Sequence, residues 1–126
     1  KIKGEIKYHV LHAQIWMKQL GHGTEESHAR MQTALNEAMP LALGIFEAST
    51  YEAELIEQGV FAGEQELRTR WLEAVAITLE QSNLVMPDID ALTPAYGGRQ
   101  GYHTPYLQPL LDEMASVFRL DPGTEW

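Results

Sequence analysis

The chain has 126 residues, a formal net charge of −9 and no cysteine. A hydrophobic fraction of 44% and a charged fraction of 21% are typical of a folded globular protein, and the length allows one domain. The lack of cysteine excludes disulfides and cysteine-ligated metal sites and favours a reducing, cytoplasmic location. The acidic balance excludes nucleic acid as the main partner, because binding to phosphates needs a basic patch.

Nothing in the sequence indicates a membrane protein. No apolar run is long enough to cross a bilayer. The first segment intersperses lysine, glutamate and histidine among its apolar positions, unlike the apolar core of a secretory signal. We therefore expect no membrane partner.

Residues 1–20 predict a helix that is apolar on most of its sides. One set of apolar residues recurs at spacings of three and four: Ile2, Ile6, Val10, Ala13, Met17 and Leu20. A second set, on another side, is Tyr8, Leu11 and Ile15. Such a helix belongs inside a bundle. The pattern is already under way at Lys1 with no cap before it. We therefore expect further N-terminal helices of the same subunit to cover this helix, because the later segments are too short to surround it.

The next helix is predicted to begin after a glycine-rich turn. Thr24 is a suitable N-cap, and acidic residues follow it in the first turn. This helix is expected over residues 24–39, with a bend or break at Pro40. Residues 41–48 are expected to continue as helix after the proline.

The rest of the chain predicts shorter helices and one long loop. Residues 51–58 indicate a short helix, residues 64–83 a long one, and residues 86–101 a loop rich in proline and glycine. The expected buried face of the long helix is Leu67, Trp71, Ala74, Val75, Thr78 and Leu79. A last helix is expected from Thr104 as N-cap, with Pro105 at its first position. No strand pattern occurs, so the predicted fold class is all-α.

Glu5, His9 and His12 are the candidate metal ligands, because spacings of four and three place them on one face of a helix. A carboxylate-bridged di-iron centre needs a Glu-x-x-His from each of two helices and a glutamate from each of two more. The third residue after Glu5 is Tyr8, not histidine. We therefore favour a polar pair of Glu5 and His9 that orients the bundle, and we predict no metal, cofactor or catalytic residue in this chain.

Three other features suggest chemistry only at first sight. Glu25-x-x-His28 has the spacing of a metal-ligand pair, but it lies in the first turn of a helix, where Glu25 complements the helix dipole. Residues 97–101, Gly-Gly-Arg-Gln-Gly, lack the strand and the Lys-Ser/Thr of a phosphate loop. A flexible loop is the simpler interpretation, and Arg99 could meet an anionic group on a partner. Trp126 is expected to dock on the body of the protein or on a partner.

Several segments together resemble the PaaC-type subunits of the phenylacetyl-CoA epoxidases. They are Glu5-Ile6-Lys7-Tyr8-His9, Gly23-Thr24-Glu25-Glu26-Ser27, Gly97-Gly98, Gly101, His103-Thr104 and Pro122-Gly123-Thr124-Glu125-Trp126. Their order and separations match the C-terminal half of that family. The resemblance implies that residues 1–126 are the C-terminal half of a single ferritin-like helical bundle, with one core helix and peripheral helices.

The resemblance also implies a function. The family belongs to a bacterial multicomponent monooxygenase in which a sister subunit holds the di-iron site and the CoA thioester. The PaaC-type subunit lacks the metal ligands, and Tyr8 agrees with that loss. The implied role is a non-catalytic structural subunit that supports the di-iron subunit of a phenylacetyl-CoA ring 1,2-epoxidase in aerobic phenylacetate catabolism.

Two departures and two alternatives accompany this resemblance. Gly4 stands where relatives carry a lysine, and Pro105-Tyr106 stands where they carry Glu-His after His-Thr. One alternative is a metal-binding, di-iron helical-bundle oxygenase subunit that uses Glu5, His9 and His12. The other is an unrelated helical adaptor.

Overall fold

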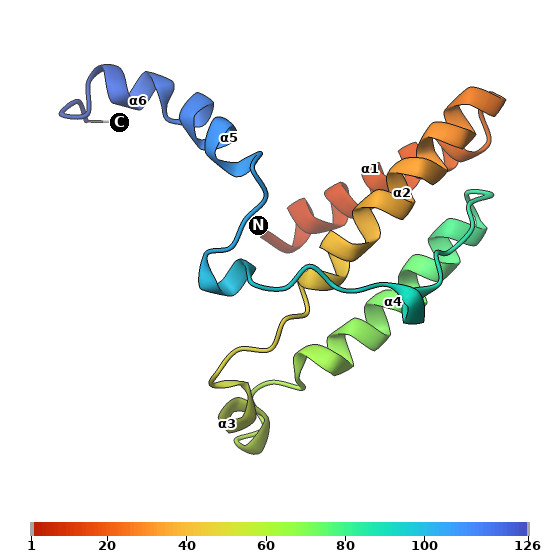
Figure 1. Ribbon diagram of the computed structural model, residues 1–126, viewed down its shortest axis with the longest axis horizontal. Helices are drawn as coiled ribbons and strands as arrows, with labels where there is room; N and C mark the ends of the chain where they lie inside the picture. Colours follow the sequence, from red (N-terminus) through yellow and green to blue (C-terminus); the bar gives the residue numbers. More distant parts are fainter. Residues whose placement is uncertain (1, 126) are drawn as a thin grey trace.

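The computed structural model describes residues 2–125, and every regular element in that range is helical (Figure 1). The α-helices are α1 (Ile2–Gly21), α2 (Glu25–Gly44), α3 (Glu52–Glu57), α4 (Glu64–Glu80), α5 (Leu107–Met114) and α6 (Ser116–Leu120). Two short 3₁₀ turns, η1 (Ile89–Ala91) and η2 (Gly98–Gln100), lie in the connection between α4 and α5. The prediction of an all-α fold is confirmed.

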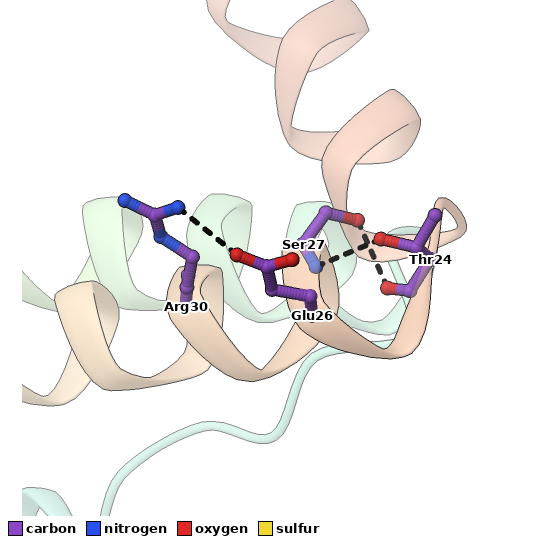
Figure 2. A network of polar contacts seen from close by, with 4 residues as sticks. All are labelled: Thr24, Glu26, Ser27 and Arg30. Atoms are coloured by element: carbon purple, nitrogen blue, oxygen red, sulfur yellow. Dashed lines mark hydrogen bonds and ion pairs between the residues drawn. The ribbon is translucent and has the colours of Figure 1, made fainter.

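The turn between α1 and α2 is fixed by the cap that the sequence predicts. The Thr24 hydroxyl accepts a hydrogen bond from the Ser27 backbone N–H at 3.1 Å. The Ser27 hydroxyl in turn donates to the Leu20 carbonyl at 2.8 Å, near the end of α1. Figure 2 shows this cap beside the Glu26–Arg30 ion pair, one turn further along α2. The cap therefore joins the two helices as well as starting the second one.

α2 runs through Pro40 without a break, contrary to the prediction. The helix continues to Gly44 and ends there instead of reaching Ala48. Proline in a helix interior costs a backbone hydrogen bond, but Met39 and Leu43 beside it are only 2% and 0% exposed. Burial of these two side chains offsets the lost bond and keeps the segment helical. The Pro40 carbonyl also accepts a hydrogen bond from the Ala95 N–H at 2.9 Å.

The buried core is small and lies between α2 and α4. Its apolar members are Met39, Leu43, Leu79 and Leu84, and Ser82 is buried beside them. Of the predicted buried face of α4, Leu79 is buried, and Trp71, Val75 and Thr78 are half-buried, whereas Leu67 and Ala74 are exposed. The Trp71 ring lies 5.5 Å from the Phe46 ring, centroid to centroid, which packs the segment after α2 against α4.

α5 begins at Leu107, three residues later than predicted. Thr104 is not its N-cap and Pro105 is not its first residue, because the helix starts after Tyr106 with no side-chain cap. A start at Pro105 would require Pro109 to donate a hydrogen bond to the Pro105 carbonyl, and proline has no N–H. With the start at Leu107, Pro109 falls in the first turn, where N–H groups have no partner within the helix.

Much of the chain's surface remains open. The accessible surface is 9928 Å². A compact monomer of this mass would expose about 6,800 Å², roughly 3,100 Å² less. Most of the difference is visible in Figure 1, where half of α1 has no neighbour on its outer side and α5–α6 extend away from α2 and α4. The expectation that the later segments do not surround the first helix is confirmed.

Candidate interaction surfaces

The outer face of α1 is a continuous apolar and aromatic surface. Ile6 is 57% exposed and Trp16 is 48% exposed, although a helix of this composition belongs in a protein interior. The Tyr8 ring stacks on the His12 ring with centroids 6.0 Å apart, and the His12 ring meets the edge of the Trp16 ring at 6.3 Å. These rings follow one another at spacings of four residues, so they form a stripe along the helix.

The candidate metal ligands Glu5, His9 and His12 all lie on this exposed helix. Within residues 2–125, no three histidine, cysteine, aspartate or glutamate side chains gather closely enough to hold a metal ion. His9 instead lies at the edge of the Tyr8 ring, with centroids 5.8 Å apart. The structure therefore places the three candidates on one helix but does not bring them together as a ligand set.

The inner end of α1 is packed by backbone contact. A Cβ atom added at Gly21 would lie 1.8 Å from the Ser82 carbonyl oxygen, which is closer than any real contact. Gly21 is therefore required for the end of α1 to reach the end of α4. His22, the next residue, has its Nε2 atom 3.0 Å from the Gln81 carbonyl oxygen.

Two side chains of α2 hold the segment that follows α4. The Nε2 atom of His28 lies 2.8 Å from the Asn83 carbonyl oxygen. Gln32 makes two hydrogen bonds with Val85, donating to its carbonyl at 2.9 Å and accepting from its N–H at 2.8 Å. His28 thus has a structural contact, which agrees with the interpretation that Glu25-x-x-His28 is not a ligand pair. The Gln32 contact has no sequence signal.

The glycine-rich segment 97–101 is an ordered turn and not the flexible loop that the composition predicts. Gly97 and Gly101 have φ angles of 107° and 87°, a region that favours glycine. The Glu47 carboxylate lies within the turn and accepts hydrogen bonds from the N–H groups of Gly97 at 2.9 Å and Arg99 at 3.5 Å. The backbone donors that would face a phosphate in a phosphate loop therefore face an internal carboxylate.

This environment lowers the pKa of Glu47 below its ordinary value. The largest cause is the hydrogen bond from the Gly97 N–H, and burial opposes it in part. The Arg99 N–H, the Gln100 side chain and the Arg99 charge lower the pKa further. Each of these contacts favours the ionised carboxylate. Sequence reasoning missed Glu47, because no spacing rule connects an acid in residues 45–51 to a turn 50 residues later.

Arg99 is paired within the chain and does not wait for an external anion. Its guanidinium contacts the Glu64 carboxylate at 2.5 Å, at the first residue of α4. The Glu64 N–H donates to the Glu52 carboxylate at 2.9 Å, so Glu52 of α3 caps the start of α4. The prediction that Arg99 could meet an anion on a partner thus gives way to a structural role, in which Arg99 joins the turn to α4.

An open groove of about 720 Å³ lies where this turn meets α2 and α5. Its lining includes Leu41, Ile45, Tyr96, Tyr102, Tyr106 and Leu110. All of these side chains are more than one third exposed. Beyond the groove, residues 107–125, here called the C-terminal arm, continue as the amphipathic helices α5 and α6. The groove and the arm form a second surface with exposed apolar groups, separate in sequence from α1.

Two further predictions concern membranes and the end of the chain. Among residues 2–125, no helix combines the length and apolar character needed to cross a membrane. Trp126, expected to dock on the body or on a partner, lies outside the described residues.

Comparison with known proteins identifies the family. The PaaA/PaaC family model, described as phenylacetic acid catabolic protein, matches residues 1–126. The chain is also 32% identical over 122 residues to the PaaC-type subunit of the 1,2-phenylacetyl-CoA epoxidase of Escherichia coli (strain K12). That alignment covers 97% of the chain and 48% of the relative, so the chain spans about half the length of the curated relative it matches. Because the family model matches the chain from end to end, the chain belongs to the PaaA/PaaC family of phenylacetic acid catabolic proteins.

Proposed function

We propose that this chain is part of a non-catalytic structural subunit that supports the di-iron subunit of a phenylacetyl-CoA 1,2-epoxidase in aerobic phenylacetate catabolism. The observation that carries the proposal is the similarity to a PaaC-type epoxidase subunit along 97% of the chain. Family membership also removes the alternative of an unrelated helical adaptor.

The arrangement of α1 supports a structural role. A Glu-x-x-His ligand pair would place a histidine at position 8, where this chain has Tyr8. The Tyr8 ring is engaged with the rings of His9 and His12, so the aromatic groups on this helix pack on one another. We assign the exposed apolar face of α1 to further helices of the same subunit, in a ferritin-like bundle of which residues 1–126 form one half. The proposed location is the cytoplasm.

Metal content and assembly together test the proposal. We expect the purified protein to contain no stoichiometric iron, manganese or zinc, and we expect it to co-purify with a di-iron subunit that carries Glu-x-x-His motifs. Mass spectrometry of the metals and co-expression with that subunit measure the two properties. About one metal ion per chain, lost in His9→Ala but kept in the matched variant His103→Ala, would instead favour the di-iron alternative that uses Glu5, His9 and His12.

A further inference from the structure

The groove and the C-terminal arm form one continuous apolar surface. Leu110 belongs to α5 and also lines the groove, and Met114 follows it one helical turn later. Met114 is 72% exposed, and Leu120 at the end of α6 is 85% exposed. Figure 1 shows the arm extending away from α2 and α4, so these helices do not cover it. Exposed apolar surface of this extent marks a binding site more often than a free surface.

The composition of the groove is that of a protein interface. Tyr96, Tyr102 and Tyr106 come from three neighbouring turns of the chain and are all exposed. Tyrosine is enriched where partner proteins bind, because it offers a rigid apolar ring and a polar hydroxyl. An open groove with an apolar floor is the shape that receives an amphipathic helix.

The charge of the arm specifies the occupant. Residues 107–125 contain four acidic residues, Asp112, Glu113, Asp121 and Glu125, and one basic residue, Arg119. The Arg119 guanidinium is already paired with Asp112 at 2.8 Å. A partner helix with lysine or arginine beside its apolar face complements this surface. A second copy is disfavoured, because each chain carries a net charge of −9 and the two arms would repel each other.

We propose that the groove and the C-terminal arm bind an amphipathic helix of the partner subunit whose apolar face is flanked by lysine and arginine. The inference rests on the proposed function, in which the partner is the di-iron subunit. It adds the surface of this chain that makes the contact and the chemistry of the surface that it meets. The exposed face of α1 is left for the helices of its own bundle.

The test compares two pairs of matched variants in binding to the co-expressed di-iron subunit. Leu110→Ala with Met114→Ala removes two apolar groups of the arm, and Val60→Ala with Ile77→Ala removes two equally exposed groups elsewhere. We expect the arm variant to bind about tenfold more weakly or worse, and the control to stay within about twofold of the parent. Glu113→Lys is expected to weaken binding more than Glu57→Lys on α3. The affinity of the parent is expected to fall between about 50 mM and about 500 mM NaCl.

The outcomes separate the inference from the proposed function. If the parent protein binds and the arm variant binds equally well, the inference is wrong and the proposed function stands. If the parent does not bind the di-iron subunit, both are wrong. If the chain alone sediments as a dimer that the arm variant dissociates, the occupant is a second copy and the inference is also wrong. Circular dichroism checks that each variant keeps its helix content, since all of the altered side chains are exposed.

Discussion

The contact between Gly21 and Ser82 leads to a sharp prediction about stability, because two glycines of the same helix provide their own control. Gly21→Ala would place a Cβ atom 1.8 Å from the Ser82 carbonyl oxygen. Gly4→Ala, near the other end of α1, meets nothing within 4 Å. The same chemical change therefore causes a backbone clash at one site and none at the other.

The magnitude follows from the shift that the clash requires. To reach an ordinary separation, the end of α1 must move about 1.5 Å from the end of α4, a strain of the kind that costs about 1–3 kcal/mol. That shift also stretches the contact between His22 and the Gln81 carbonyl, now 3.0 Å, and losing it costs about 1 kcal/mol more. We expect Gly21→Ala to lower the free energy of unfolding by about 2–4 kcal/mol. Gly4→Ala should raise it by up to about 1 kcal/mol, because alanine favours a helix interior.

Urea unfolding followed by circular dichroism measures both changes. The midpoint for Gly21→Ala should fall by about 1–2 M, with little change in the slope of the transition. Gly44→Ala gives an independent check, because its Cβ atom would lie 2.2 Å from the Ala95 carbonyl oxygen and it should also destabilise. Equal unfolding free energies for Gly21→Ala and Gly4→Ala, within about 0.5 kcal/mol, would refute the reasoning.

Two further predictions concern polar contacts that the sequence does not reveal. Gln32→Ala removes both hydrogen bonds to Val85 and should cost about 1–2 kcal/mol in urea unfolding, whereas Gln58→Ala, which loses one bond within α3 and its C-cap, should cost less; equal costs would contradict the role of Gln32. Because the folded pKa of Glu47 is lowered, its ionised form stabilises the fold above the ordinary carboxyl pKa, and this stability is lost as the pH falls toward the folded pKa. The stability difference between the parent and Glu47→Gln should therefore shrink between about pH 7 and about pH 3, and a constant difference would rule out the charge as its cause.

The elements that the sequence predicts well are those with a local cause. Thr24 starts α2 as expected, because an N-cap needs only the residues within one turn of it. The short helix α3 and the start of α4 at Glu64 also match, since glycines mark their boundaries. The exposure of α1 follows from its composition, because a helix that is apolar on most sides needs more neighbours than short segments can supply.

The predictions that were wrong all involve partners distant in sequence. Pro40 breaks helices in general, but here the burial of Leu43 by α4 outweighs its local cost. The turn at residues 97–101 looked flexible because its anchor, Glu47, lies 50 residues earlier. Side chains cannot signal such contacts through spacing, since the register between two helices is set by packing and not by either sequence alone.

The two exposed surfaces of this chain have opposite charge character, and this difference assigns them to different neighbours. α1 carries three lysines and one glutamate, whereas residues 107–125 carry four acids and one arginine. A single acidic neighbour would fit α1 and repel the arm, and a single basic neighbour would do the reverse. Both surfaces need cover, because the chain exposes roughly 3,100 Å² more than a compact monomer would. The charge pattern thus favours separate neighbours for α1 and for the arm, which is the division expected of a subunit whose bundle is completed on one side and whose partner binds on the other.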